Sequence, residues 1–140
     1  MSSTMKVDIV SAEANIFTGE ANMVVVTGEL GELGIKSGHA QLLTRLKPGH
    51  VRVQLSDGTE ELFYISGGFL EVQPDIVTVL ADTADRAQNL DEAAALEAQK
   101  HAQKLLHDNQ ADIDYATALT QLAQATAQLE AIRLLKRNLQ

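Results

Sequence analysis

The chain has 140 residues, 45% of them apolar, a formal net charge of −8 and no Cys. This apolar fraction supports a packed core, which excludes a disordered chain, and the length predicts one domain or two small ones. Without Cys there is no disulfide scaffold and no thiolate zinc site, and the negative charge disfavours nucleic acid and anionic lipid as partners. No apolar run approaches the ~18 residues of a membrane span, so we expect no direct membrane insertion.

The composition changes at about Arg86. All nine Gly, both Pro and all ten Val lie in residues 1–86, whereas residues 87–140 contain none of these and hold thirteen Ala. Because Val favours strands and Ala favours helices, the sequence predicts two domains, a β-rich domain over 1–86 and a helical domain over 87–140.

The first domain is predicted to consist of many short strands joined by tight turns. Apolar and polar residues alternate at 5–9 and at 51–55, which is the pattern of half-buried strands. Asp57-Gly58 predicts a hairpin turn after the second of these strands, and Pro74-Asp75 predicts a further turn. The expected fold class is therefore α+β, with an antiparallel β-sandwich or flattened barrel at the N-terminus.

The run Met23-Val24-Val25-Val26 is apolar on both faces of a predicted strand. One explanation is a strand buried on both sides within the domain. The other is an exposed face that docks a partner, with Met23, Val24 and Val26 as the candidate docking residues. The sequence leaves both open.

The second domain is predicted to contain two helices, separated by a polar break at 107–111. Asn89 or Asp91 can cap the first helix, and Asp112 or Asp114 the second. Apolar stripes at helical spacing follow these caps: Ala95, Ala98, Ala102 and Leu105, then Ala118, Leu122, Ala125, Leu129 and Ile132. Facing stripes predict an antiparallel hairpin. Because Ala buries little area, we expect this hairpin to dock only marginally, so that a partner could open it.

No catalytic or metal-binding constellation is recognisable. The Gly-rich stretch at 28–40 lacks the Gly directly before Lys36-Ser37 that a phosphate-binding loop needs. Ser66-Gly67-Gly68 lacks the Gly before Ser that marks a nucleophile elbow, and instead indicates close backbone approach. The four His have no metal-ligand spacing. We therefore expect a structural or regulatory subunit without activity of its own, with no cofactor and no metal.

Several motifs together resemble the epsilon subunit of bacterial F-type ATP synthases along essentially the whole chain. They are Asp8-Ile9-Val10-Ser11-Ala12-Glu13, Gly31-Glu32-Leu33-Gly34-Ile35 with Gly38-His39, and Ser66-Gly67-Gly68 with Glu71-Val72-Gln73-Pro74. The resemblance implies a sandwich of about ten strands and a C-terminal helical hairpin. It also implies a place in the central rotor stalk, peripheral to the cytoplasmic face of the bacterial inner membrane. There the sandwich binds the gamma subunit and the c-ring, and Glu32 and His39 lie in the loop region that faces the c-ring.

The resemblance further implies that the hairpin regulates the motor. Folded on the sandwich it permits turnover, and extended it reaches between the catalytic alpha and beta subunits and blocks ATP hydrolysis. Arg133, Lys136 and Arg137 would then contact acidic groups of those subunits. The plain alternative for these residues is cations at a helix C-terminus, where the helix dipole favours them.

Some members of this family bind ATP in the folded hairpin through a motif that this chain keeps only in part. Leu90-Asp91 and Ala95 remain, but Ala94 stands where the motif has Arg. Further basic positions are occupied by His101, Gln124 and Gln128. We therefore expect no ATP cofactor. A free-standing nucleotide-sensing regulatory protein is the alternative function.

Overall fold

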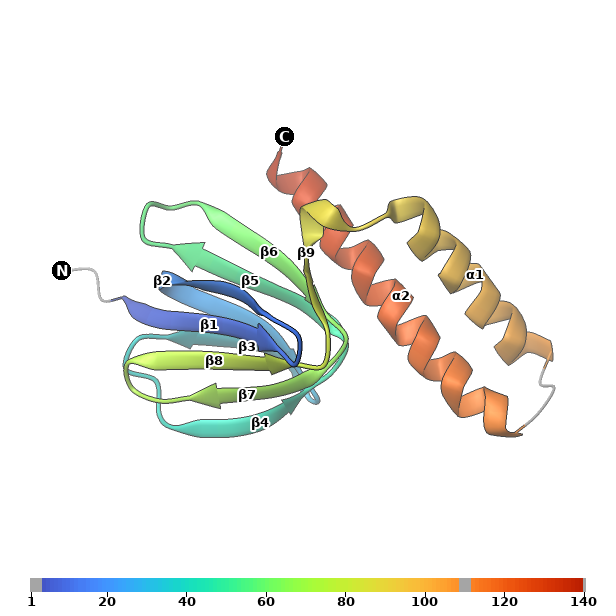
Figure 1. The fold of residues 1–140 in the computed structure, drawn as a ribbon, viewed down its shortest axis with the longest axis horizontal. Helices are drawn as coiled ribbons and strands as arrows, with labels where there is room; N and C mark the ends of the chain where they lie inside the picture. The colour runs from blue at the N-terminus through green and yellow to red at the C-terminus, as the bar shows by residue number, and fades with distance from the viewer. Residues whose placement is uncertain (1–3, 109–111, 140) are drawn as a thin grey trace.

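The computed structural model describes residues 4–108 and 112–139 (Figure 1). Nine strands are assigned within these ranges, where about ten were expected. They are β1 (Met5–Ser11), β2 (Asn15–Gly28), β3 (Gly31–Lys36), β4 (Leu42–Leu46), β5 (Gly49–Leu55), β6 (Glu60–Ile65), β7 (Gly68–Val72), β8 (Ile76–Ala81) and β9 (Ala84–Arg86). A 3-10 turn (Ala87–Asn89) follows, and then α1 (Glu92–Asp108) and α2 (Asp112–Asn138).

The strands form one sheet that folds round on itself into a flattened sandwich. Its order is β1-β8-β7-β4-β2-β5-β6-β9, with β3 paired to β2. The long β2 closes the sandwich because its first half pairs with β1 and its second half with β3 and β5. All strand pairs are antiparallel except β1 with β8, which run parallel. The predicted α+β fold of a β-sandwich followed by two packed helices is confirmed.

The core of the sandwich is built from the inward faces of the strands and needs no helix. Its fully buried members include Phe63, Ile65 and Leu70. Val24 and Val26 belong to the same cluster with 0% exposure, and they face Val53 and Leu33 across the strand pairs. Val24 and Val26 are therefore buried within the domain and are not available to dock a partner, whereas Met23 on the same strand is half-buried.

The helical part forms the predicted hairpin. Asp91 caps α1, because its side-chain oxygen accepts the backbone N–H of Ala94 at 3.1 Å. The two proposed caps of the second helix, Asp112 and Asp114, have side chains outside the part that the structure describes. The seam between α1 and α2 is closely packed through small residues: Ala95, Ala102, Ala118 and Ala125 are all buried.

α2 lies between the sandwich and α1 (Figure 1). One face of α2 packs on α1, and the other packs on the outer surface of β6 and on the 3-10 turn. This contact forms a small cluster separate from the sandwich core, made of Leu62, Tyr64, Ala87, Ala127, Ala131 and Leu134. We call these six residues the docking cluster. They attach the hairpin to the sandwich.

Candidate functional site

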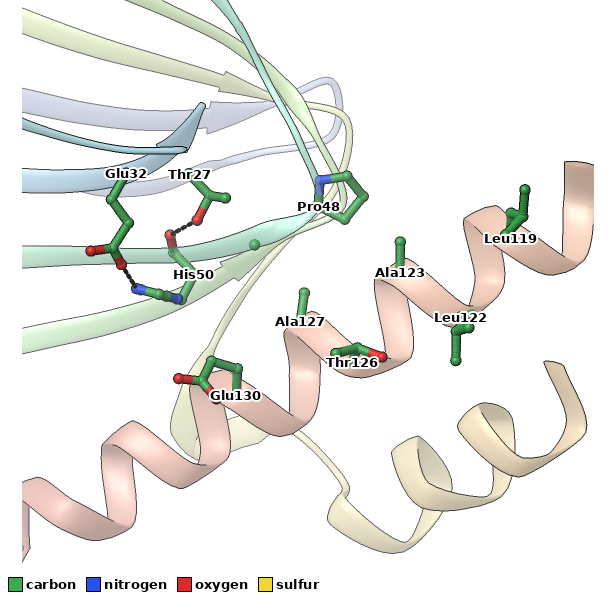
Figure 2. Close-up of a pocket in the computed structure, with 11 residues that line it drawn as sticks. Thr27, Glu32, Pro48, His50, Leu119, Leu122, Ala123, Thr126, Ala127 and Glu130 are labelled. Carbon is green, nitrogen blue, oxygen red and sulfur yellow. Dashed lines mark hydrogen bonds and ion pairs between the residues drawn. The ribbon is translucent and has the colours of Figure 1, made fainter. Parts of the chain in front are cut away.

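The seam between the sandwich and α2 is closed at one end and open at the other. The docking cluster fills the end near the C-terminus of α2. Toward the N-terminus of α2 the helix stands off from the sandwich and leaves a cavity of about 620 Å³. Figure 2 shows Ala123 and Ala127 pointing from α2 toward Pro48, with Glu32, His50 and Glu130 at the closed end. A second cavity, of about 500 Å³, continues it past Pro48, Leu119 and Ala123.

His50 is the buried polar side chain at this seam. It lies on β5, its residue is 8% exposed, and it faces α2 rather than the core. Its Nε2 atom is 3.1 Å from a carboxylate oxygen of Glu32, close enough for an ion pair but out of line for a hydrogen bond. On the helix side, Glu130 lines the same cavity. One imidazole is thus placed between a carboxylate of the sandwich and a carboxylate of the hairpin.

Two ionisable groups of the seam have shifted pKa values. A hydrogen bond from Arg133 lowers the pKa of the Glu130 carboxyl, although burial opposes it, and the charges of Arg133, His50 and Arg137 add to the lowering. Burial raises the pKa of the Tyr64 phenol, against a hydrogen bond from Gln128 on α2. Docking therefore favours the neutral phenol of Tyr64, whereas the carboxyl of Glu130 is affected mainly by Arg133 on its own helix, which stays beside it when the hairpin is released.

The C-terminal end of α2 is tied back to its own chain. The Nζ atom of Lys136 lies 2.9 Å from one oxygen of Glu92, the first residue of α1. Asn138 donates to a carboxylate oxygen of Glu60 on β6 at 2.9 Å. Arg133 pairs with Glu130, one turn earlier on the same helix, at 3.0 Å. The predicted tail cations Arg133 and Lys136 therefore already have acidic partners when the hairpin is folded.

The two residues expected to face the c-ring lie apart. Glu32 sits on β3 beside the β2–β3 turn and lines the cavity next to α2. His39 follows the other end of β3, where Gly38 donates its backbone N–H to the carbonyl of Pro74. A strand rises about 3.3 Å per residue, so most of the length of β3 separates them. They do not form one loop region.

The groove between the two helices carries His101, Gln124 and Gln128, three of the four residues that replace basic positions of the ATP motif, whereas Ala94 does not line it. It is lined by Ala98, His101, Gln121, Gln124, Ala125 and Gln128, with a volume of about 270 Å³. None of these lining residues is Lys or Arg. The groove therefore offers amides and one imidazole where a triphosphate needs fixed positive charge.

The outer face of the sandwich exposes large apolar side chains that form a patch on neighbouring strands. Phe69 on β7 lies directly across from Leu80 on β8, and the two are 43% and 46% exposed. Leu43 on β4 is 68% exposed, and Arg45 places its guanidinium 5.5 Å from the Phe69 ring. Alternation along these strands is the signal that could have revealed this patch, since Leu70 and Val79 next to it are buried.

Metal-ligand clusters and membrane-spanning helices were both sought among the residues that the structure describes. No group of three or more His, Asp or Glu side chains is placed to hold a metal ion within the described part of the chain. Nor is any described helix both long enough and apolar enough to cross a bilayer.

Comparison with protein families matches the chain in two parts. Residues 4–87 match the family described as the ATP synthase Delta/Epsilon chain beta-sandwich domain. Residues 88–133 match the ATP synthase Delta/Epsilon chain long alpha-helix domain. The chain is 55% identical to the ATP synthase epsilon chain of Nitrosococcus oceani over 139 residues, covering 99% of both chains. It is 56% identical to that of Acinetobacter baylyi over 133 residues, covering 95% of this chain and 96% of the relative.

Two solved structures share the fold at low sequence identity. One is a chain of the Euglena gracilis mitochondrial ATP synthase OSCP/F1/c-ring, with a TM-score of 0.74, 19% identity, and coverage of 98% of this chain and 82% of the other. The second is a chain of the Tetrahymena thermophila mitochondrial ATP synthase central stalk/c-ring, with a TM-score of 0.64, 11% identity, and coverage of 94% and 98%. They support the sandwich-plus-hairpin fold.

Proposed function

Because this chain belongs to the family of ATP synthase epsilon chains, we propose that it joins gamma to the c-ring in the central stalk of a proton-translocating F-type ATP synthase and regulates that motor. The observation that carries the proposal is the match over nearly the full length to bacterial epsilon chains, sandwich and hairpin included. The chain is a non-catalytic subunit. Its place is peripheral, at the cytoplasmic face of the bacterial inner membrane.

The surface for gamma is the outer face of β4, β7 and β8. Leu43, Phe69 and Leu80 are large apolar side chains exposed to solvent. The opposite faces of their strands pack into the core. Exposed apolar side chains on adjacent strands are typical of a protein–protein contact. Arg45, stacked over Phe69, adds a cation at the edge of this patch.

The surface for the c-ring is the β2–β3 turn. Leu30 at its tip is fully exposed, and Glu29 and Glu32 flank it with carboxylates that can accept from polar loops. His39 is placed elsewhere and makes its contact with the carbonyl of Ala40, at 2.7 Å from Nδ1. Glu32 therefore faces the c-ring in this arrangement, and His39 does not.

The regulatory element is the hairpin. The docking cluster is a small apolar contact, half of it Ala, and beside it the seam is already open over about 620 Å³. Breaking such a contact costs only a moderate amount of free energy, because little apolar area is buried in it. Once released, α2 reaches the catalytic alpha and beta subunits, where Arg133, Lys136 and Arg137 contact acidic groups and block ATP hydrolysis.

Co-purification separates this proposal from the alternative of a free-standing nucleotide sensor. Affinity-tagged gamma expressed with this chain should retain it, and a variant with Leu43, Phe69 and Leu80 changed to Ser should be lost from gamma. The control changes Leu96 and Leu119, two exposed Leu of the helices, to Ser and should be retained. A wild-type chain that elutes alone would contradict the stalk role.

Cross-linking tests the assignment of the c-ring surface. The chain contains no Cys, so a single Cys introduced at Glu32 or at His39 is its only thiol. With an additional Cys in the polar loop of subunit c, the Glu32→Cys variant should form a disulfide and the His39→Cys variant should not. The reverse pattern would move the c-ring contact to the other end of β3.

The tail is tested with the assembled complex. Changing Arg133, Lys136 and Arg137 together to Ala should raise ATP hydrolysis, because three charge-assisted contacts to the catalytic subunits are lost. The increase should shrink at high salt, where screening has already weakened those contacts in the parent. Equal hydrolysis by parent and variant at low salt would leave these residues as ordinary helix-end cations.

A further inference from the structure

The three tail cations differ in what opening the hairpin would do to them. Arg133 is paired with Glu130 on the same helix, so the two move together. Arg137 makes no ion pair with any residue that the structure describes. Lys136 is paired with Glu92, which belongs to α1. Of the three, Lys136 therefore holds an ion pair that must break when the helices separate.

Glu92 and Lys136 join the two helices at the open end of the hairpin, where α1 begins and α2 ends. Both carboxylate oxygens of Glu92 lie within hydrogen-bond distance of Lys136 Nζ, at 3.1 and 2.9 Å. α1 has 17 residues and α2 has 27, so at 1.5 Å per residue they are about 26 and 40 Å long. Extending the hairpin would move Glu92 and Lys136 tens of ångströms apart. The hydrogen bond from Asn138 to Glu60 holds the same end of α2 to β6.

We propose that Glu92 is a latch: it holds Lys136 in the folded hairpin and so competes with the catalytic subunits for the tail. The same ammonium group cannot serve both acids, because the two positions are mutually exclusive. Strengthening the latch favours the folded hairpin, and removing it favours release. The link to inhibition rests on the function proposed above, whereas the latch itself is a property of the isolated chain.

The size of the effect follows from the exposure of the pair. The two side chains are 62% and 47% exposed, so solvent and salt screen their attraction. Exposed ion pairs of this kind change an equilibrium by about two- to fivefold. The latch therefore shifts the fraction of folded hairpins without making the folded state permanent. Its effect should decrease at high salt.

The first test measures hairpin opening in the isolated full chain. Two dyes attached through Cys introduced at Lys100 and Gln121, both exposed, report the separation of α1 from α2, and a second dye pair at Asp57 and Lys104 reports release of the hairpin from the sandwich.

With the first pair, Glu92→Gln should raise the ratio of open to closed hairpins about two- to fivefold at low salt. The exchange Glu92→Lys with Lys136→Glu should restore the wild-type ratio, since the pair is re-formed with its charges reversed. The control Glu97→Gln removes an exposed acid of the same helix and should change nothing.

The second test measures ATP hydrolysis by complexes that carry the same variants. Glu92→Gln keeps the tail cation and frees it, so hydrolysis should fall. The exchanged pair keeps the latch but presents an acid to the catalytic subunits, so hydrolysis should rise. If Glu92→Gln leaves the ratio of open to closed hairpins in the isolated chain at the wild-type value, the latch is overturned whatever the hydrolysis rates are. If hairpin opening changes as expected but hydrolysis does not, the latch stands and the inhibitory role of the tail fails.

Discussion

Gly68 occupies a position where no side chain fits. Its φ is +146°, and a Cβ there would overlap the carbonyl oxygen of Leu80 and lie 2.9 Å from the Cα of Ala81. The sequence predicted close backbone approach at Ser66-Gly67-Gly68, and the structure places the tightest contact at the last of these residues. At Gly67 the nearest atom is a side-chain oxygen of Asp82, 3.3 Å away. The backbone of β8, rather than the turn itself, thus determines which Gly is indispensable.

The crowding around Gly68 predicts that its substitution destabilises the protein more than substitution of a Gly in open space. Gly68→Ala should lower the free energy of unfolding by about 2–5 kcal/mol, because it combines backbone strain with overpacking. Gly58→Ala is the matched control: its φ of +92° is also unfavourable, but a Cβ there would meet nothing within 4 Å. That variant should lose only about 1–2 kcal/mol. Thermal denaturation followed by circular dichroism makes the comparison, and equal melting temperatures for the two variants would contradict this account.

The buried phenol of Tyr64 should make docking of the hairpin on the sandwich depend on alkaline pH. Burial raises the pKa of this phenol above its ordinary value of 10.0, so the neutral form belongs to the docked state. A group with a raised pKa contributes stability fully below its ordinary pKa and loses it as the pH rises through the raised value. Docking should therefore weaken above about pH 10. The dye pair at Asp57 and Lys104 measures release, and Tyr64→Phe should remove the alkaline step that this residue causes. A step of unchanged size in that variant would assign it to other groups.

At the scale of the elements, the sequence predicted one face of α2 and missed the other. The stripe through Ala118 and Ala125 has apolar spacing and packs on α1 as expected. The face through Ala127, Ala131 and Leu134 is also buried, against the sandwich. Because Ala is so frequent in this helix, apolar spacing does not distinguish a helix with one buried face from a helix with two. The prediction of marginal docking from Ala content was also incomplete, because Leu62 and Tyr64 of β6 supply larger side chains to the contact.

The second face gives a way to release the hairpin without touching the sandwich core. Ala131 is 0% exposed within the docking cluster, so Ala131→Asp would bury a carboxylate without a partner, at a cost of several kcal/mol. The dye pair at Asp57 and Lys104 should then report a released hairpin, while β-sheet circular dichroism persists. Ala123→Asp is the control, because this exposed position on the same helix borders the open cavity. Hairpins that remain docked in Ala131→Asp would show that the cluster does not hold α2.

The groove between the helices predicts weak nucleotide binding. Gln124, Gln128 and His101 line it, and no Lys or Arg is among its lining residues. Calorimetry of the isolated chain with ATP should therefore give no tight binding. A dissociation constant in the micromolar range would contradict this interpretation and favour the nucleotide-sensor alternative.

At the scale of the whole molecule, the sequence predicted the two parts but not the contacts between them. Val and Gly usage indicated a sandwich, and Ala usage indicated a hairpin. Lys136 and Glu92 lie 44 positions apart, and Asn138 and Glu60 lie 78 apart. No local spacing encodes such pairs, because they depend on how two complete elements meet. The separation of Glu32 from His39 was missed for the same reason: neighbours in a motif lie at opposite ends of one strand.

The sandwich contains everything that its own core requires. Its main cluster runs from Met5 to Ala81 and includes no residue of α1 or α2. We therefore propose 1–86 and 87–140 as independent domains, and expect the sandwich to unfold cooperatively when the helices are deleted. Loss of the helices would expose the patch around Leu62 and Tyr64 on β6 and the neighbouring His50 on β5, none of which belongs to this main cluster.

In the proposed function the sandwich joins the stalk while the hairpin restrains hydrolysis. The most direct measurement compares ATP hydrolysis and proton-driven ATP synthesis by complexes with the full chain and with a chain that lacks residues 88–140. Deletion should raise hydrolysis, since no tail remains to reach the catalytic subunits, and synthesis should persist, since the surfaces around Phe69 and Glu32 are retained. Hydrolysis that does not rise on deletion, in complexes that keep the truncated chain, would contradict the account.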